Sequence, residues 1–418
     1  MDVLFVHPNF PGQFRRLVGA LAQEQGVRIY TLGDQSWMPS FELPGVTPLS
    51  YPAPEAAGES THPYVKSLEA GVRRGQQVVR TLLPLKHQGI EFDVIYIHPG
   101  WGDGLYLKDL FPNALIISLF EYYYRPRGSD LGFDPEFPLS FDDIFRVRTL
   151  NSIQHLALES FDIGISPTAW QRSRYPEAYQ HRLECLHEGV DTEVARPNAQ
   201  ASFRLPNGTV LHAGDEVLTF VSRSLEPYRG FHQLMRALPL ILKERPDCQV
   251  VIVGQDAPSY GPAPQQDDSW RIKCLKEQEG KLDMNRIHFT GLLDFGDYIK
   301  VLQVSRVHVY LTYPFILSWS MLEAMSAGCL VIGSDTEPVK EVISHGNNGL
   351  LFPFFDTNAL SALTTNALAQ PRDYDAMRQA ARLTIQTRYD FNTVIYPQHL
   401  DLLCSLREQQ KTSYEQVL

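Results

Sequence analysis

Short apolar runs alternate with longer segments of helical spacing along the chain. Several runs are apolar without alternation, which is typical of strands buried on both faces of a parallel sheet. In the first half the runs are Val3–Val6, Arg28–Thr31, Asp93–Ile97, Ala114–Ser118, Asp162–Ser166 and Leu183–His187. The segments between them place apolar residues on one helical face; they include Gln13–Gln25, Tyr64–Leu83 and Phe145–Glu159.

The second half repeats this alternation. Its apolar runs are Val217–Ser222, Gln249–Val253, Arg286–Phe289, Val307–Leu311, Cys329–Ile332 and Leu350–Phe352. Its helical segments include Phe231–Glu244, Tyr298–Val304, Trp319–Ala327 and Val339–Ser344, and the tail from Asp373 to Leu418 is also helix-rich. Alternating strands and helices indicate an α/β protein with parallel sheets, and two such series predict two doubly wound domains. The segment Arg196–Asp215, which contains prolines, glycines and small polar residues, is the predicted linker.

Length, charge and cysteine usage narrow the class of protein. The 418 residues exceed what one hydrophobic core usually organises, so two or three domains are expected. A formal net charge of −11 argues against a dedicated nucleic-acid binder, which would carry a basic stripe. The five cysteines have no metal-ligand spacing, which favours free thiols in a reducing cytoplasm. We expect no transmembrane helix and no signal peptide, because long apolar runs and a basic start are missing.

The turn after the first strand is a candidate phosphate site. It contains Gly12 and leads into a helix, so free backbone N–H groups would lie at a helix N-terminus. The alternative is that Gly12 only allows the turn. The following segment, Gln13–Gln25, carries Arg15 and Arg16 beside apolar residues. It is either a helix packed on the first domain or a surface that contacts anionic lipid.

Two arginines follow the first strand of the second half. Arg223 lies at the predicted carboxyl end of this strand, and Arg229 lies beyond a turn. Parallel α/β sheets bind ligands at the carboxyl ends of their strands, and guanidinium groups match phosphate oxygens. The alternative is that both arginines are surface residues paired with Glu226 or with solvent.

The segment from Thr312 to Gly328 is the most informative. Ser318 is a plausible N-cap for a helix in which Glu323 has apolar neighbours. A carboxylate in that environment needs a partner, and a ribose diol supplies one in dinucleotide-binding folds. The alternative partner is a local backbone amide or an arginine.

Two further polar residues follow strands of the first half. His98 lies at a predicted strand end before a glycine-rich corner, and Glu121 occupies a similar position. Both are candidates for the ligand crevice, although a single histidine is more often structural. Tyr123, in the tyrosine run after Glu121, belongs either to the core or to an acceptor platform.

Together these segments resemble the family-four glycosyltransferases, a retaining class with the GT-B fold, and within it a bacterial subgroup. The most specific match is Leu322-Glu323-Ala324-Met325 followed by Gly328. Arg223 stands where the family has its strand-end Arg, and Arg229-Gly230 stands where it has Lys-Gly. Further matches extend the resemblance over nearly the whole chain; they are Glu188-Gly189-Val190-Asp191, Val251-Ile252-Val253-Gly254, His288-Phe289-Thr290-Gly291 and Gly333–Val339 with Glu341.

The resemblance implies an architecture and an activity. Two Rossmann-like domains would face each other across a crevice: residues 1–195 on the acceptor side, completed by a helix at 395–418, and residues 196–394 on the donor side. The implied reaction transfers a hexose-type sugar from a nucleotide-diphosphate donor, UDP-sugar favoured, to an unidentified glycan, lipid or small-molecule acceptor. No cofactor and no metal are expected. The implied location is cytoplasmic, with peripheral contact to the inner face of the membrane as an option.

The resemblance also implies residue roles. Arg223 and Arg229 would clamp the diphosphate, Glu323 would hold the ribose hydroxyls, and His98 would bind the donor sugar near the reaction centre. The other donor-binding residues would be Gly12, Gly254, Leu292, Ser318 and Trp319, and the acceptor candidates are Glu121 and Tyr123.

One position departs from the family pattern. The family usually has a first Glu eight positions before Glu323, where this chain has Phe315. That Glu normally contacts the transferred sugar, so the departure concerns sugar selectivity and not nucleotide binding. Two alternatives therefore stand beside a transferase: a GT-B nucleotide-sugar epimerase, and a non-catalytic nucleotide-sugar-binding protein, which Phe315 favours.

Overall fold

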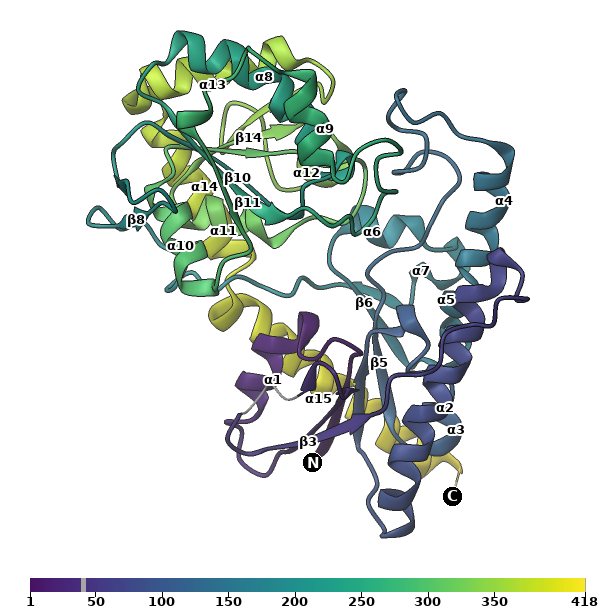
Figure 1. Cartoon of the computed structure of the whole chain (residues 1–418). Coiled ribbons are helices and arrows are strands. Elements are labelled where there is room, and N and C mark those ends of the chain that lie inside the picture. Colours follow the sequence, from purple (N-terminus) through teal and green to yellow (C-terminus); the bar gives the residue numbers. More distant parts are fainter. Residues whose placement is uncertain (39–42, 418) are drawn as a thin grey trace. The chain divides into compact units, whose positions relative to one another are not determined.

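The computed structural model describes residues 1–38 and 43–417, with side chains through residue 408. It divides into two compact units (Figure 1). Unit 1 comprises Met1–Glu188 and Asn392–Leu418, and unit 2 comprises Gly189–Phe391. The sequence interpretation placed these boundaries after residues 195 and 394, whereas the structure has them after Glu188 and Phe391.

Unit 1 is built on a parallel sheet of seven strands in the order β3-β2-β1-β4-β5-β6-β7. The strands are β1 (Asp2–Val6), β2 (Arg28–Asp34), β3 (Val46–Tyr51), β4 (Val94–Ile97), β5 (Leu115–Leu119), β6 (Ile163–Ser166) and β7 (Leu183–Cys185). Six of them were predicted from apolar runs. β3 was not, because this edge strand is largely exposed and contains Pro48, so it lacks the apolar run of a central strand.

The helices of unit 1 include one from the C-terminal end of the chain. They are α1 (Arg15–Leu21), α2 (Lys66–His87), α3 (Leu107–Leu110), α4 (Phe141–Leu150), α5 (Ser152–Ser160), α6 (Ala169–Arg174), α7 (Glu177–Gln180) and α15 (Tyr396–Val417). The predicted helix Phe145–Glu159 is in fact two helices, α4 and α5. Asn151 separates them, and its side chain binds the backbone N–H and C=O of Tyr124 at 3.0 and 2.9 Å.

The apolar residues of α1 and of the turn before it face the core of unit 1. Phe14, Leu17, Val18 and Leu21 are each at most 5% exposed. The lipid-contacting alternative for this segment needs these side chains at the surface, so the structure favours the packed helix. Among the described residues, no helix combines the length and apolar character needed to span a bilayer.

Unit 2 has a parallel sheet of six strands in the order β12-β11-β10-β13-β14-β15 and a separate hairpin. The sheet strands are β10 (Val217–Ser224), β11 (Gln249–Gln255), β12 (Ile287–Gly291), β13 (Val307–Tyr310), β14 (Leu330–Ser334) and β15 (Leu350–Phe352). The hairpin, β8 (Ser202–Arg204) and β9 (Val210–His212), occupies the predicted linker. Its Phe203 and Leu211 are buried in the core of unit 2, so this segment is part of the unit and the linker prediction was wrong.

The helices of unit 2 cover its sheet. They are α8 (Phe231–Glu244), α9 (Trp270–Glu277), α10 (Phe295–Val304), α11 (Trp319–Ala327), α12 (Glu337–Lys340), α13 (Thr357–Ala369) and α14 (Asp375–Arg388). The helix predicted at Val339–Ser344 lies earlier, as α12, with Pro338 in its first turn.

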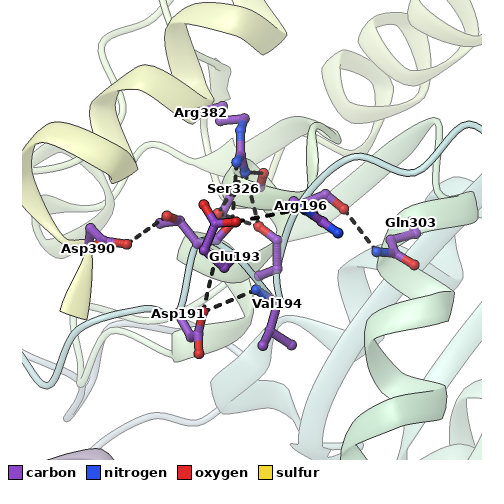
Figure 2. Close-up of polar contacts among 10 residues, drawn as sticks. Asp191, Glu193, Val194, Arg196, Gln303, Ser326, Arg382 and Asp390 are labelled. Carbon is purple, nitrogen blue, oxygen red and sulfur yellow. Dashed lines mark hydrogen bonds and ion pairs between the residues drawn. The ribbon is translucent and has the colours of Figure 1, made fainter. Parts of the chain in front are cut away.

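The first residues of unit 2 are hydrogen-bonded to segments nearer its C-terminal end (Figure 2). The Arg382 guanidinium donates to the carbonyls of Thr192, Ala195 and Ser326 at 3.2, 3.2 and 2.6 Å. The Thr192 hydroxyl donates to Asp390 at 2.6 Å. These contacts keep both ends of unit 2 together.

Each sheet starts at an interior strand and winds outward in both directions. The strand order therefore reverses between β1 and β4 in unit 1 and between β10 and β13 in unit 2. At such a switch point the loops leave the carboxyl strand ends in opposite directions and open a crevice for a ligand. These two switch points position the candidate site residues described below.

A buried carboxylic acid in unit 1 gives a first testable expectation. Asp103 is fully buried, accepts a hydrogen bond from the Tyr51 hydroxyl, and burial raises its pKa to about 6. The folded state thus binds this proton more tightly than the unfolded state, and stability falls as the pH rises from about 4 to 6. At pH 8 the ionised group costs about 3 kcal/mol.

Asp103→Asn removes this charge and keeps an acceptor for Tyr51. We expect the variant to have a free energy of unfolding about 1–3 kcal/mol higher than the wild type at pH 8 in urea titrations, with a smaller gain at pH 5. A gain that is equal at both pH values would contradict the assignment.

Candidate functional site

Arg229 is the central cation at the switch point of unit 2. It ends the short helical turn Pro227–Arg229 that follows β10, and its side chain is buried. Its Nη1 donates to Thr312 Oγ1 at 3.0 Å and to the Ile316 carbonyl at 2.7 Å, in the loop that follows β13. Arg229 therefore joins the two loops that leave the switch point in unit 2.

Glycine at position 230 allows this arrangement. Gly230 has a φ of +67°, and a Cβ there would lie 2.3 Å from the Leu311 side chain. A larger residue would push α8 away from the loop after β13, so the Arg229-Gly230 pair predicted from the sequence has a local structural reason.

Arg223 lies near the carboxyl end of β10 and differs from Arg229 in its surroundings. Its side chain is exposed, and it takes part in no ion pair or side-chain hydrogen bond of the described residues. The Arg223 guanidinium is therefore available to a ligand, whereas that of Arg229 is held by the protein.

Glu226 forms no ion pair with either arginine in the described structure, so the alternative interpretation holds only in its solvent form, for the exposed Arg223 and not for the buried Arg229. Its carboxylate is fully buried and accepts hydrogen bonds from the backbone N–H groups of Ser259, Tyr260 and Gly261 at 3.0–3.2 Å. Glu226 thereby fixes the loop after β11 beside the switch point. This contact could not be predicted from the sequence, because its partners are backbone groups of a distant segment.

An aromatic cluster stands where the family pattern has its first Glu. The Phe315 ring is buried, with centroid distances of 4.8 Å to Tyr260 and 5.4 Å to Tyr228. The Arg229 guanidinium lies 5.6 Å from the Phe315 ring and 5.3 Å from the Tyr260 ring, which is a cation–π arrangement. Phe315 thus contributes a ring contact to Arg229, at the position where the family pattern has a carboxylate.

The helix α11 carries the predicted ribose-binding carboxylate. Ser318 caps the helix by accepting from the Ser320 backbone N–H, Trp319 is its first residue, and Gly328 ends it with a φ of +87°. Glu323 is buried and accepts a hydrogen bond from the Tyr298 hydroxyl of α10 at 2.6 Å. The Tyr298 hydroxyl is thus one partner of this carboxylate.

The two remaining donor-side candidates have other surroundings. A Cβ at Gly254 would lie 2.7 Å from the Ser222 carbonyl, so glycine is needed there for β11 to pack against β10. Leu292 follows β12, the edge strand, and is 60% exposed. No hydrogen bond or ring contact of the described residues joins either of them to Arg229 or Glu323.

Four polar side chains meet at the switch point of unit 1. His7 follows β1, His98 follows β4 and Glu121 follows β5, and Gln13 lies in the turn before α1. His7 Nε2 is 2.9 Å from Gln13 Oε1, Gln13 Nε2 donates to Glu121 Oε1 at 2.8 Å, and His98 Nε2 is 3.3 Å from Glu121 Oε2. The sequence singled out His98 and Glu121 but missed His7 and Gln13.

The backbone determines which ring nitrogens carry protons. The Nδ1 atoms of His7 and His98 accept from the backbone N–H groups of Asn9 and Gly100 at 3.0 and 3.2 Å. Each Nε2 therefore carries a proton and donates, to Gln13 and to Glu121 respectively. Burial, and then the nearby His98, lower the pKa of His7 to about 3, so this ring is neutral.

Glu121 is the ionised member of this group. Burial acts to raise its pKa, but the hydrogen bonds from His98 and Gln13 and the electrostatic effect of His98 outweigh burial and hold the pKa below its ordinary value. The group therefore presents one carboxylate, supported from both sides by N–H donors.

Two other predicted site residues of unit 1, Gly12 and Tyr123, pack against other residues of the protein. A Cβ at Gly12 would lie 2.4 Å from His7 Nε2, so glycine lets the turn pack against the His7 ring. Tyr123 is 6% exposed, and its hydroxyl lies 2.8 Å from His155 Nε2. Of the two interpretations of the tyrosine run, the structure favours the core for Tyr123.

Solved structures identify the class of this architecture. A sucrose-phosphate synthase from Thermosynechococcus elongatus matches 98% of this chain and 100% of its own, with a TM-score of 0.73 at 19% identity. HepE from Anabaena, solved with UDP-glucose, matches 97% of this chain and 100% of its own, with a TM-score of 0.69 at 16% identity. The fold is that of the GT-B glycosyltransferases, as the sequence predicted.

Family models cover both units. The model "Glycosyl transferase family 4 group" matches residues 25–195, and "Glycosyl transferases group 1" matches residues 206–384. The chain belongs to the family 4, group 1 glycosyltransferases.

Curated relatives match a smaller part of the chain than these solved structures do. The phosphatidyl-myo-inositol mannosyltransferase of Mycobacterium tuberculosis is 29% identical over 43% of this chain and 44% of its own length. That of Propionibacterium freudenreichii is 28% identical over 73% of this chain and 68% of its own length. The match to the mycobacterial relative thus spans less than half of either protein.

Proposed function

We propose that the protein is a retaining glycosyltransferase that transfers a hexose from a nucleotide-diphosphate sugar to an acceptor with a free hydroxyl. The donor binds at the switch point of unit 2, a UDP-sugar is the favoured donor, and the reaction takes place in the cytoplasm without a metal ion. The support comes from the family membership and from the charges at the two switch points.

The observation that carries this proposal is the buried Arg229. A buried cation without a carboxylate partner destabilises a protein unless another group compensates it. Arg229 takes part in no ion pair of the described residues, and carbonyl and hydroxyl oxygens supply its hydrogen bonds. The buried Glu226 carboxylate attracts Arg229 without forming an ion pair with it, and a diphosphate bound beside Arg229 and the exposed Arg223 would supply a directly contacting negative charge.

The remaining residues fit roles in the same reaction. Glu323, held by Tyr298, would bind the ribose hydroxyls of the donor. The bond between the anomeric carbon and the phosphate oxygen breaks while the acceptor oxygen attacks from the same face, and the acceptor proton passes to the departing phosphate. Arg223 and Arg229 would stabilise the negative charge that develops on this leaving group.

The choice of sugar has its own support. HepE was solved with UDP-glucose, and the relatives named above are mannosyltransferases. At position 315 this chain offers an aromatic ring and not a carboxylate. UDP-glucose is therefore the first donor to test, followed by GDP- and ADP-sugars.

Thermal unfolding of the full chain with UDP, GDP and ADP tests the nucleotide. We expect one of them to raise the melting temperature, because a ligand at 100 times its Kd stabilises the folded state by about 2.7 kcal/mol. Three nucleotides without effect would contradict the proposal.

Turnover of the matched nucleotide sugar, with and without EDTA, then tests the reaction. We expect NMR to show a glycoside, or free sugar that is released slowly by hydrolysis. The product that forms first should have the anomeric configuration of the donor sugar, and the rate of turnover should not depend on EDTA. Conversion into another nucleotide sugar without acceptor would identify an epimerase. Tight binding without any turnover would identify a non-catalytic binding protein.

A further inference from the structure

The switch point of unit 1 contains a carboxylate that the protein itself only half satisfies. Each oxygen of Glu121 accepts one side-chain hydrogen bond, from Gln13 and from His98. A carboxylate oxygen has two acceptor sites, so one site remains on each oxygen. The Glu121 side chain is 18% exposed, against 5% for His98, so solvent reaches the carboxylate better than it reaches the imidazole.

His98, in contrast, has no ring nitrogen left to hydrogen-bond a ligand. Its Nδ1 accepts from Gly100 and its Nε2 donates to Glu121. The predicted role of His98, a direct hydrogen bond to the donor sugar, would require the bond to Glu121 to break. In this structure His98 holds Glu121, and Glu121 is the group that remains able to accept from a ligand.

An aromatic ring lies next to the two histidines of this group. The Trp101 ring is half-buried and lies 4.3 Å from the His98 ring and 5.1 Å from the His7 ring, centroid to centroid. Small-molecule sites typically combine an aromatic wall with a few fixed polar groups. An amphipathic sugar ring fits this pair, because its C–H face can lie on an indole while two neighbouring hydroxyls donate to one carboxylate.

We propose that Glu121 and Trp101 form a binding site for a neutral sugar or polyol, with Glu121 accepting hydrogen bonds from two adjacent hydroxyls. Gln13, His98 and, through Gln13, His7 are positioning residues. The fixed negative charge selects against ligands with a phosphate or carboxylate near the bound hydroxyls. The identification of this polyol as the acceptor, and only that, rests on the proposed function.

Saturation-transfer NMR with the full chain and methyl α-D-glucopyranoside tests this site. We expect binding to the wild type and at least about tenfold weaker binding to Glu121→Gln, because a hydrogen bond to a charged acceptor is replaced by a weaker one. Glu184→Gln is the matched control, since Glu184 is an exposed residue of β7, and it should bind like the wild type. No binding to the wild type, or equal binding to Glu121→Gln, overturns the proposal.

Two further measurements separate binding from structural effects. The anion methyl α-D-glucuronide should bind the wild type more weakly than the neutral glucoside. In Glu121→Gln the difference in affinity between the two sugars should be smaller. Trp101→Leu keeps an apolar side chain without a ring and should also weaken glucoside binding. Equal affinities for both sugars in the wild type would exclude a role for the charge.

The positioning role of His98 has a separate readout. His98→Gln can still donate from Nε2 to Glu121, whereas His98→Ala cannot. We expect His98→Gln to retain most of the glucoside affinity and His98→Ala to lose as much as Glu121→Gln does. Equal losses of glucoside affinity in His98→Gln and His98→Ala would contradict a positioning role for His98.

The nucleotide measurement distinguishes this inference from the proposed function. Stabilisation by a nucleoside diphosphate should be the same in Glu121→Gln and wild type, because Arg223, Arg229 and Glu323 belong to unit 2. If the nucleotide binds and the glucoside does not, the further inference fails and the proposed function stands. If the glucoside binds and no nucleotide does, the proposed function fails and the further inference stands.

Discussion

Acidification to pH 5 is expected to destabilise unit 1 by about 5 kcal/mol, and unit 2 by about 2 kcal/mol, relative to pH 7.5. Burial lowers the pKa of His7, His187 and His399 in unit 1 to about 3, 3 and 4. Burial also lowers the pKa of His308 in unit 2 to about 3. The unfolded chain binds these protons near pH 6.5, so stability is complete above that pH and falls as the pH decreases toward the folded values.

The size of this effect follows from linkage. Each buried histidine costs about 2 kcal/mol at pH 5, since the pH then lies 1.5 units below the pKa of the unfolded residue. Asp103 opposes them by about 1 kcal/mol, because its raised pKa favours the folded state in acid. Single domains are stable by only about 5–15 kcal/mol, so this is a large part of the stability of unit 1.

Calorimetry between pH 7.5 and pH 5 checks this expectation. We expect a transition that moves steeply with pH, assigned to unit 1 by the variant His399→Phe, which removes one titrating group and should reduce the slope. His181→Asn is the control, because His181 is exposed and its loss should leave the slope unchanged. Melting that is independent of pH over this range would show that the buried histidines are not neutral in the folded state.

The sequence predicted the elements whose signals are local. The helix α11 has the predicted bounds because Ser318 caps one end and Gly328 ends the other. The central strands were predicted because parallel strands buried on both faces are apolar throughout. The edge strand β3 and the hairpin β8–β9 were missed because half-exposed or very short strands lack that run.

The candidate site was predictable only as far as the strand ends. Arg223, His98 and Glu121 follow apolar runs, so their place at a sheet edge could be inferred. Their partners could not be: Gln13 meets Glu121, and Glu226 meets the backbone of Ser259–Gly261, across long sequence separations. Such contacts depend on loop geometry, which strand and helix patterns do not specify.

The same limit explains the residues whose surroundings differ from the prediction. Tyr123 follows Glu121 by two positions, so the alternation of a strand would place both on one face. The chain leaves β5 at Leu119, however, and Tyr123 is buried against His155 while Glu121 reaches solvent. Periodicity ceases to predict orientation where the strand ends.

Replacement of Arg223 by alanine is expected to lower sugar transfer about 100- to 1,000-fold, the usual effect of losing one preorganised donor to a developing negative charge. Arg223 is exposed and takes part in no ion pair of the described residues, so its truncation should leave the melting temperature of the free protein unchanged. Arg372→Ala is the matched control, because Arg372 is an exposed arginine of the same unit, in the turn before α14, and it should keep full activity.

Arg223→Lys distinguishes charge from geometry. A lysine keeps the positive charge but cannot bind two phosphate oxygens in parallel, so we expect activity between those of the wild type and the alanine variant. Initial rates with the matched donor and nucleotide-dependent melting temperatures, measured on all four proteins, decide the matter. Wild-type transfer and wild-type nucleotide stabilisation in Arg223→Ala would remove Arg223 from the site.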